Sequence, residues 1–244
     1  LAVMASLSDF LFMEESNARL FVQAPNSLKG NYKQKLDTSN ASFKAKAGDV
    51  DYIGAGDLDV LSKIRELVTL LPSNNEEEGC IIECGDDLNR VLPGFANELE
   101  DIKKAIVDMA DSNYFFETKS EYAKEMVTGF IRLNGITTGV VANRTKVLDE
   151  NGKAVMQFEP VLTTGGCRKA AAFVRFCDAF DIPVLTLAGV TGFKADIREE
   201  ETLAKAAAEL TYAFADATVP KVNVIVGKSY GSAYVAMNSK HIGA

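Results

Sequence analysis

The stretch from Phe173 to Tyr234 constrains the fold most, because two short apolar runs in it each stop at a glycine-bearing turn. The runs are Pro183–Val190 and Val222–Val226, and the turns are Thr191-Gly192-Phe193 and Tyr230-Gly231-Ser232-Ala233. A buried strand that leads through a small-residue turn into a helix leaves backbone N–H groups pointing into open space. Two such turns side by side can hold an oxyanion without a catalytic side chain. The pattern therefore favours stabilisation of an enolate on a thioester, or polarisation of a urea carbonyl.

Length and composition limit the classes of protein to consider. The chain has 244 residues, 47% of them hydrophobic, which suits one large or two modest domains with a sizeable core. The net charge of -8 argues against a nucleic-acid-binding surface, although a local basic patch can still hold a phosphate group. No apolar run approaches the ~18–20 residues of a membrane span, and no signal peptide is visible at the start. The first residue is Leu rather than Met, which favours a processed or excerpted piece.

The four cysteines do not form a zinc-binding pattern. Cys80 and Cys84 have three residues between them and the one histidine, His241, is distant, whereas structural zinc sites usually show paired Cys-x-x-Cys units. We therefore expect no metal in this chain. Cys177 lies on an apolar helix face and is expected to be a small core residue. This cysteine usage fits a reducing cytoplasm.

Hydrophobic periodicity in the first part of the chain predicts a mixture of short elements. Ser6–Met13 and Leu20–Gln23 predict strands, and the polar stretch Asn31–Val50 predicts an exposed loop with at most one helical turn. Helices are predicted at Asp57–Leu71, with Asp57 as its cap, and at Asp101–Met109. The part between these helices, with Pro93 and Gly94, predicts irregular structure.

The second part of the chain predicts alternating strands and helices. Apolar runs at Glu125–Leu133 and Ile136–Asn143 are joined by Asn134-Gly135, the strongest hairpin signal in the sequence. Helices and strands then alternate along the chain, at Cys167–Phe180, Pro183–Ala188, Glu199–Ala217, Val222–Val226 and Gly231–Asn238. Near-continuous apolar strands between helices indicate α/β layering. We place a domain boundary near residue 105, which gives domains 1–105 and 106–244.

Two motifs fail when their spacing is checked, and the one histidine lacks a partner. Gly227-Lys228-Ser229 resembles the end of a phosphate loop, but the Gly required five residues earlier is Val222. Gly54-Ala55-Gly56 begins like a dinucleotide fingerprint, but Asp59 stands where the third Gly belongs. His241 has no apparent Ser or Cys partner at a nucleophile elbow.

The turn at Tyr230–Ala233 remains a candidate binding site, although a purely structural role for its glycine is also open. Glycines at a strand-to-helix crossing often serve only to let elements pack closely. Thr191-Gly192-Phe193 is a weaker signal on its own. Together the two turns follow successive predicted strands, and open α/β sheets place ligands at such positions.

Five segments carry a resemblance to a known family. They are Ser6–Met13 (SLSDFLFM), Leu71–Asn75 (LPSNN), Phe130–Arg144 (FIRLNGITTGVVANR), Phe173–Phe193 (FVRFCDAFDIPVLTLAGVTGF) and Ala217–Tyr234 (ATVPKVNVIVGKSYGSAY). In these segments the chain resembles the biotin-dependent acyl-CoA carboxyltransferases. That family includes the β subunits of propionyl-CoA and acetyl-CoA carboxylases and the related subunits of methylmalonyl-CoA decarboxylase and transcarboxylase. The segments occur in the family's order and span nearly the whole chain.

The resemblance implies a fold, a reaction and partners. The fold is α/β with two repeated crotonase-like domains (the ββα spiral of the ClpP/crotonase superfamily), and both domains are expected to be truncated here. The assembly is a homo-oligomer, usually a hexamer, in which the N domain of one subunit faces the C domain of another. A carboxyl group moves between carboxybiotin and the α-carbon of a short acyl-CoA. The implied partners are a biotin carboxyl carrier protein that bears the biotin, and a biotin carboxylase or membrane decarboxylase subunit, with no nucleic acid.

The resemblance also implies site residues in the two turns. The backbone N–H groups that stabilise the biotin enolate are carried over to Ser232 and Ala233, with Gly192 and Phe193 at the other turn. Substrate-binding positions are Gly231, Tyr234, Val235 and Thr191. The chain departs from the family at three of these positions, because Ser232 replaces a Gly, Thr191 replaces a Pro, and Val235 stands where propionyl-type members often have Asp. The family's N-domain donor turn precedes the Ser6–Met13 segment and would lie before Leu1.

Two rival functions remain beside carboxyl transfer. A crotonase-like hydratase or isomerase acting on acyl-CoA usually adds a Glu or Asp acid/base near the thioester α-carbon, and no such residue can be placed from this sequence. A non-catalytic scaffold subunit would keep the fold for assembly alone. Biotin-dependent CO₂ exchange supports the first reading, water addition to an enoyl-CoA the second, and neither activity the third.

Overall fold

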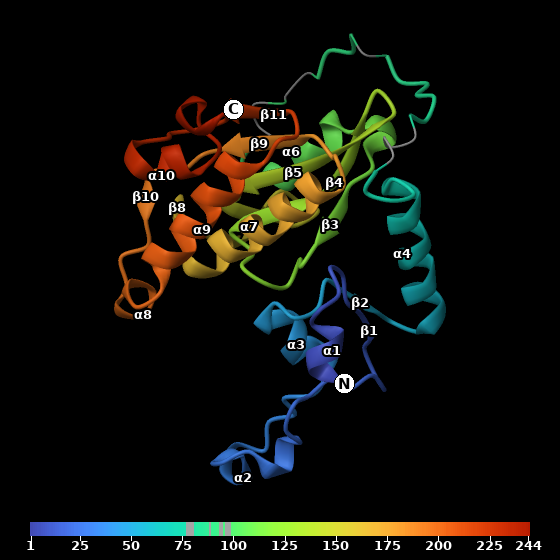
Figure 1. Cartoon of the computed structure of the whole chain (residues 1–244), viewed down its shortest axis with the longest axis vertical. Coiled ribbons are helices and arrows are strands. Elements are labelled where there is room, and N and C mark those ends of the chain that lie inside the picture. Colours follow the sequence, from blue (N-terminus) through green and yellow to red (C-terminus); the bar gives the residue numbers. More distant parts are fainter. Residues whose placement is uncertain (77–80, 88, 93–94, 96–98) are drawn as a thin grey trace. The chain divides into compact units, whose positions relative to one another are not determined.

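The chain forms two compact units, and a five-stranded sheet is the main element of the second (Figure 1). The first unit comprises residues 1–69 and 118–123, and the second comprises residues 70–117 and 124–244. The computed structural model describes residues 1–76, 81–87, 89–92, 95 and 99–244. Cys80, Pro93 and Gly94 lie outside the described residues, and the predicted domain boundary near residue 105 stays a prediction.

In the first unit, a parallel pair of short strands packs with small helices. Strand β1 (Phe12–Glu14) runs parallel to β2 (Tyr52–Gly54), with Met13 opposite Ile53. Helices α1 (Ala2–Ala5), α2 (Asn31–Gln34) and α3 (Ala41–Ala47) and the 3₁₀ turn η1 (Pro25–Ser27) complete this part. The core of the unit is small and consists of Ala2, Met13, Leu20, Ala41, Ala45 and Val50.

Three sequence predictions for this unit are wrong in whole or in part. Most of Ser6–Met13 is turn and only its end joins β1, and Leu20–Gln23 contains no strand, since Phe21 and Val22 are exposed and pair with no described strand. The stretch Asn31–Val50 holds two helices, because Ala41 and Ala45 recur at helical spacing and are buried while Asn40 accepts the N–H of Phe43 as an N-cap.

Helix α4 (Asp57–Leu70) confirms the predicted helix, but Asp57 is not its cap. Asp57 is the first helical residue, and it is Asp59 whose carboxylate accepts the N–H of Ala55 at 2.9 Å. Only Leu67 and Leu70 among its apolar side chains are buried.

The sheet of the second unit has the strand order β11-β9-β5-β4-β3. Strands β4 (Met126–Leu133) and β5 (Ile136–Asn143) form the predicted antiparallel hairpin, and Asn134 and Gly135 adopt φ values of 53° and 77° in its turn. Two left-handed residues in sequence are what a two-residue hairpin turn requires. Strands β9 (Val184–Ala188) and β11 (Lys221–Ile225) continue the sheet in parallel from β5, and β3 (Phe116–Thr118) lies at the other edge.

Helices cover both faces of this sheet, which confirms the α/β class (Figure 1). Helix α6 (Ile102–Met109) packs its Ala105 and Ile106 against Val127 and Ile131 of β4. Phe130, which precedes Ile131 in β4, points to the other face, where α7 (Thr164–Ala179) and α9 (Leu203–Asp216) lie side by side. The described helices include none that combines the length and the apolar character needed to cross a bilayer.

Aromatic side chains bind α7 to the sheet. The ring of Phe130 lies 5.0 Å from Phe173 and 6.0 Å from Phe176, and Phe176 stacks on Phe180 at 4.6 Å. The helical spacing of Phe173, Phe176, Cys177 and Phe180 predicts one buried stripe; the first three are buried, whereas Phe180 is half-buried. From the order of elements the sequence also predicts that this helix packs against the strand Pro183–Ala188, whereas in the structure it packs chiefly on α9 and on β4.

The remaining elements lie around the sheet. The predicted helix Glu199–Ala217 is divided into α8 (Ile197–Glu200) and α9, because Thr202 takes a non-helical conformation between them. Two small sheets stand beside the main one: β6 (Lys146–Leu148) with β7 (Ala154–Gln157), and β8 (Val161–Leu162) with β10 (Gly192–Phe193). The chain continues through α10 (Gly231–Ala236) and the 3₁₀ turn η3 (Lys240–Ile242).

Candidate functional site

The carboxyl ends of three strands meet at one edge of the main sheet. Strands β5, β9 and β11 run in the same direction and end at Asn143, Ala188 and Ile225. The N–H of Val226 continues the ladder to the carbonyl of Ala188 at 2.9 Å. The segments that follow β9 and β11 therefore begin side by side, where a parallel sheet places its ligands.

Hydrogen bonds join the two predicted turns directly. The N–H of Tyr230 donates to the carbonyl of Val190 at 3.0 Å, and the N–H of Val190 donates to Oγ of Ser229 at 3.4 Å. A third contact comes from β5, where Oδ1 of Asn143 accepts the N–H of Gly189 at 3.2 Å. The structure thus brings the two glycine-bearing turns together, as the sequence predicted.

The turn at Thr191-Gly192-Phe193 is held by a short parallel strand. Thr191 donates its N–H to the carbonyl of Pro160 at 2.7 Å, and Gly192 and Phe193 form β10 opposite Val161 and Leu162. This strand in turn contacts α10. The position of a Cβ on Gly192 would meet no atom within 4 Å, so space is open beside that residue.

The start of α10 presents backbone donors without acceptors. The first helical hydrogen bond of α10 runs from the N–H of Tyr234 to the carbonyl of Tyr230 at 3.2 Å, and no side chain caps the helix. No described residue accepts the N–H of Ser232 or of Ala233. Backbone donors left in this way are available to an anion or to a polarised carbonyl oxygen.

Gly231 gives this turn its direction. It adopts a φ of 58°, a left-handed conformation that glycine takes without steric cost, and a Cβ there would stand in open space. Ser232 is not among the residues with positive φ. The serine that replaces a family glycine therefore has an ordinary helical backbone, and its N–H is retained.

The other predicted site residues lie around α10. Tyr234 and Val235 follow the donor turn and are half-buried, whereas Ala233 is 1% exposed. Phe193 is 37% exposed and Tyr230 is 56% exposed, so aromatic rings border both turns. His241 is exposed in η3.

Sequence reasoning missed Asn143 and Ser229, whose side chains hold the two turns. Asn143 is 9% exposed and is the polar residue that ends an apolar strand. A polar side chain at the carboxyl end of a buried strand is a signal that could have found it. Ser229 carried no comparable signal.

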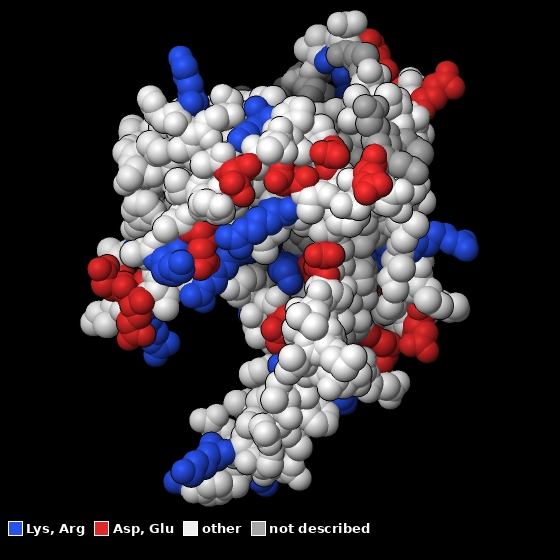
Figure 2. Space-filling view, viewed as in Figure 1, with Lys and Arg blue, Asp and Glu red and all other residues white. Residues whose placement is uncertain are grey.

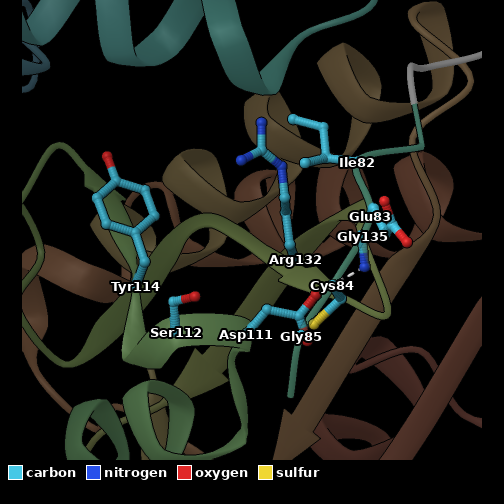
Figure 3. Close-up of a pocket in the computed structure, with 9 residues that line it drawn as sticks. All are labelled: Ile82, Glu83, Cys84, Gly85, Asp111, Ser112, Tyr114, Arg132 and Gly135. Carbon is cyan, nitrogen blue, oxygen red and sulfur yellow. Dashed lines mark hydrogen bonds between the residues drawn. The ribbon is translucent and has the colours of Figure 1, made fainter.

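A second hollow lies beside the turn of the β4–β5 hairpin, away from the strand ends described above (Figure 3). Its volume is about 350 Å³, and Cys84, Asp111, Tyr114 and Arg132 are among its lining residues. The segment at Ile82 lies directly on the hairpin turn, because its N–H donates to the carbonyl of Gly135 at 3.2 Å and a Cβ on Gly135 would fall 1.8 Å from the carbonyl oxygen of Ile82.

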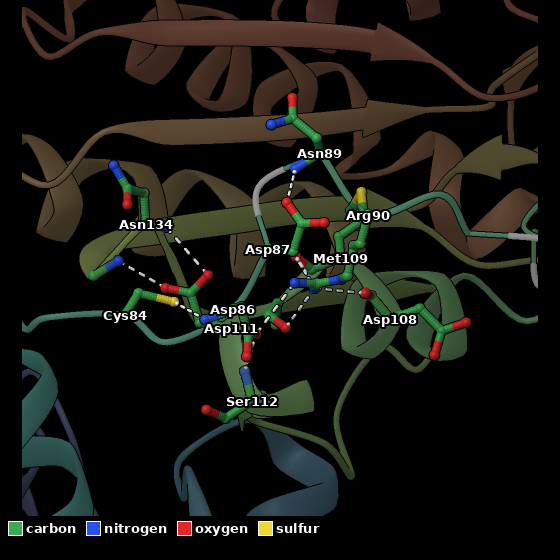
Figure 4. A network of polar contacts seen from close by, with 12 residues as sticks. Cys84, Asp86, Asp87, Asn89, Arg90, Asp108, Met109, Asp111, Ser112 and Asn134 are labelled. Atoms are coloured by element: carbon green, nitrogen blue, oxygen red, sulfur yellow. Dashed lines mark hydrogen bonds and ion pairs between the residues drawn. The ribbon is translucent and has the colours of Figure 1, made fainter.

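Polar contacts at and beside this hollow give Asp111 and Asp86 structural roles (Figure 4). Asp111 accepts the N–H groups of Asn134 and Gly135 at 3.1 and 2.7 Å, and Asp86 accepts the N–H of Ser112 at 2.7 Å. Arg90 donates to the carboxylate of Asp86 and to three backbone carbonyls at the C-terminal end of α6, those of Asp108, Met109 and Ala110. Sγ of Cys84 and one carboxylate oxygen each of Asp86 and Asp111 lie within 4.8 Å of one another. The Asp111 carboxylate holds the hairpin turn, and the Asp86 carboxylate holds Arg90, which in turn binds the last carbonyls of α6.

Comparison with known proteins places the chain in a recognisable group. Residues 2–244 match the family model described as the carboxyl transferase domain. The chain is 38% identical to the propionyl-CoA carboxylase beta chain of Roseobacter denitrificans and 32% identical to methylmalonyl-CoA decarboxylase subunit alpha of Propionigenium modestum. Each match covers 98% of this chain and 47% of the relative, so the chain spans about half the length of these relatives.

The same group is found among solved structures. The crystal structure of transcarboxylase 12S, described as a hexamer assembly with hydrolyzed methylmalonyl-coenzyme A bound, superimposes with a TM-score of 0.83 at 30% identity. That match covers 98% of this chain and 47% of the other.

Proposed function

The chain belongs to the carboxyl transferase domain family, and from this membership we propose that it is part of a biotin-dependent acyl-CoA carboxyltransferase. It moves a carboxyl group between carboxybiotin and the α-carbon of a short acyl-CoA, in the direction of either carboxylation or decarboxylation. The proposal extends to the activity of a polypeptide about twice as long, because the relatives are covered to 47%.

One observation supports this reading above the others. The N–H groups of Ser232 and Ala233 have no acceptor among the described residues, and they stand beside the ends of β9 and β11. A paired set of backbone donors at the end of a parallel sheet stabilises a developing oxyanion without a proton-transfer side chain. Such a site suits a urea or thioester carbonyl that becomes an enolate.

The residues of this chain then take the following roles. Ser232 and Ala233 donate their N–H groups to the ureido oxygen of biotin, and Gly192 and Phe193 form the facing wall. Carboxybiotin, when bound, supplies the CO₂ that forms the new bond to the acyl α-carbon. The groups at Gly231, Tyr234, Val235 and Thr191 shape the space for the acyl tail and the biotin ring. The half-buried positions of Tyr234 and Val235, directly after the donors, support this assignment.

The proposal includes the fold, the assembly and the partners. The fold is crotonase-like with two repeated domains, and residues 1–105 belong to one of them and residues 106–244 to the other. We propose a homo-oligomer, a hexamer like that described for transcarboxylase 12S, in which a second subunit completes the cleft. Biotin arrives on a carrier protein, and a biotin carboxylase or a membrane decarboxylase subunit completes the system. The protein works in the cytoplasm, since its described cysteines are free thiols.

The test measures carboxyl exchange on the full-length protein. Purified protein is incubated with its biotin carrier and ¹⁴C-carboxyl-labelled methylmalonyl-CoA, and transfer of label to the carrier is followed. We expect transfer that depends on biotin and is blocked by avidin. Hydration of crotonyl-CoA without biotin-dependent transfer would instead establish a crotonase-like hydratase, and neither activity in a folded oligomer would establish a scaffold subunit.

A further inference from the structure

Two asparagine side chains fasten the C-terminal end of α10 to two strands of the main sheet. Nδ2 of Asn223 in β11 donates to the carbonyls of Met237 and Asn238 at 2.9 and 2.7 Å. Nδ2 of Asn238 donates to Oγ1 of Thr186 in β9 at 3.2 Å, and both Asn238 and Thr186 are fully buried. We call Asn223, Asn238 and Thr186 the α10 clamp.

The α10 clamp is built on one register position of the parallel sheet. Asn223 of β11 lies directly opposite Thr186 of β9, so the two side chains point to the same face. Each is a polar residue inside a strand of otherwise apolar residues, as in the run Val222-Asn223-Val224. Asn238 adopts a φ of 55°, a left-handed conformation that asparagine tolerates better than most residues and that often ends a helix. The chain therefore turns back after α10 at the residue that bonds Thr186.

Helix α10 is too short to fix its own direction. It has six residues and no side-chain cap, and helices of fewer than about 12–15 residues are marginal without tertiary contacts. One end of α10 follows Tyr230, whose N–H bonds the carbonyl of Val190, and the other end leads into the α10 clamp. Ala233 and Met237 are four residues apart, which is about 6 Å along a helix axis. A shift at the clamp is therefore transmitted directly to the donor N–H groups.

The segment that carries the donors has no charge of its own. Residues 229–239 contain no Asp, Glu, Lys, Arg or His, and the surface around α10 is largely uncharged on the face seen in Figure 2. What this segment offers an oxyanion comes from backbone N–H groups, which act at distances of about 2.7–3.1 Å. A misplacement of about 1 Å can cost about 10²-fold in rate. The direction of α10 is therefore decisive for its donors.

We propose that Asn223 and Thr186 are positioning residues for carboxyl transfer. Acting through Asn238 and the last carbonyls after α10, they hold the helix so that the N–H groups of Ser232 and Ala233 point at the developing oxyanion. The proposal rests on the donor role proposed above. It extends the site to side chains at the far end of the helix, which act through α10 and not on the substrate.

Unpaired polar atoms beside the α10 clamp support a role beyond stability. Oδ1 of Asn223, Oδ1 of Asn238 and Oγ of Ser239 are buried and have no hydrogen-bond partner among the described residues. Buried polar atoms without partners lower stability, and apolar side chains in a purely structural contact would leave none. Proteins retain such departures from good packing chiefly at functional sites.

The experiment measures kcat and KM for carboxyl exchange on the full-length protein with its biotin carrier. Thr186→Val keeps the shape of the side chain, suits a buried strand and removes the acceptor of the Asn238 amide. Asn223→Asp keeps the shape but cannot donate to the two carbonyls when its carboxyl group is ionised. Each change should lower kcat about ten- to hundredfold. KM for the acyl-CoA should change by less than about twofold, because the lost alignment acts in the transition state.

Two further variants separate positioning from general damage to the sheet. Thr186→Ser keeps the hydroxyl group and should retain most of the activity that Thr186→Val loses. Thr138→Val is the matched control, since Thr138 is a buried threonine of β5 whose hydroxyl donates to the carbonyl of Ile136 within the same strand. It should leave kcat and KM unchanged. Hydrogen exchange with mass spectrometry gives a readout independent of the reaction: in Thr186→Val, the amides of residues 231–239 should exchange faster, and those of the β4–β5 hairpin should not.

Three results would overturn the proposal. One is an unchanged kcat in folded Thr186→Val and Asn223→Asp proteins. Another is an equal loss of kcat in Thr186→Ser and Thr186→Val, because the hydroxyl group would then be irrelevant. The last is a raised KM with an unchanged kcat, which indicates substrate binding and not alignment of the donors. Absence of carboxyl exchange in the unchanged protein, with faster hydrogen exchange at residues 231–239 in Thr186→Val, would reject the proposed reaction and the catalytic role of the clamp while retaining its hold on α10.

Discussion

The guanidinium group of Arg144 holds the carboxylate of Asp101 through two hydrogen bonds of 2.9 Å, although the residues are 43 positions apart in the chain. Both side chains are nearly buried, with 10% and 4% exposed. Asp101 also accepts the N–H of Lys103 as the N-cap of α6 and the N–H of Leu148 in β6. The pair therefore joins the start of α6 to the end of the β4–β5 hairpin.

Removal of Arg144 should destabilise the protein strongly. Arg144→Ala leaves a buried carboxylate without its charge partner, and breaking such a pair typically costs about 3–5 kcal/mol. Urea unfolding at pH 7 measures the loss, and Lys146→Ala, which removes the exposed ion pair with Glu100, is the control and should cost under about 1 kcal/mol. Equal effects of the two changes would contradict this account of the pair.

The donor role of α10 is tested by removing one N–H. Ala233→Pro eliminates a backbone donor that has no acceptor among the described residues, so carboxyl transfer should fall by about 10²–10³ or more while the protein remains folded. Ser232→Ala changes only a side chain and should retain activity. Near-normal turnover in a folded Ala233→Pro protein would show that this N–H takes no part.

Packing of α7 predicts a large cost for one phenylalanine. Phe176 is 9% exposed and contacts Phe130 and Phe180, so Phe176→Ala should lower the free energy of unfolding by about 3–5 kcal/mol. Its neighbour Arg175 is exposed, and Arg175→Ala should change stability by about 0.5 kcal/mol at most. Both thermal and urea unfolding should show that Phe176→Ala is far more destabilising than Arg175→Ala.

Buried thiols should resist alkylation. Burial raises the pKa of Cys167 to about 12, with further contributions from Glu199 and Glu125, and burial likewise raises the pKa of Cys177 far above its usual range. Because the thiolate is the reactive form, both thiols should stay unmodified by iodoacetamide at pH 8 until the protein unfolds. Peptide mass spectrometry reads each site separately, and Cys84, which is only half-buried, should be modified in the folded protein. Rapid labelling of Cys177 in folded protein would refute its burial.

The wall at Val235 should discriminate poorly by chain length. It is an apolar, half-buried side chain directly after the donor turn, and one methylene in an apolar pocket is worth about 1–3 kcal/mol. We expect each added methylene, from acetyl- to propionyl-CoA and from propionyl- to butyryl-CoA, to change kcat/KM by less than about 10³-fold. A larger preference would show that another group sets specificity.

The sequence predicted the layered part of the fold well, because its elements are read from local patterns. The hairpin turn at Asn134-Gly135 needs left-handed backbone, and the strands around it are buried by both helix layers. The first unit was predicted poorly at Leu20–Gln23, since an apolar run becomes a strand only where a partner strand pairs with it. There, Phe21 and Val22 are left exposed.

The sequence predicted where the candidate site lies, but not the hydrogen bonds that hold its two turns together. Strand-end glycines indicated where the turns lie, and the structure places them together. The bonds from Ser229 to Val190 and from Asn143 to Gly189 join residues 39 and 46 positions apart. Such contacts depend on strand order and register, which no local pattern contains.

The strand order also has a consequence for the order of folding. Strands β4 and β5 are neighbours in sequence, whereas β9 and β11 reach the sheet only after long connections. Local contacts form quickly and distant pairings slowly, so the hairpin should form early and the edge that carries Ser232 and Ala233 should assemble late. In a refolding experiment, return of carboxyl transfer should therefore lag behind return of secondary structure, and a chain stalled on the ribosome before residue 221 would hold the hairpin without its donor turn.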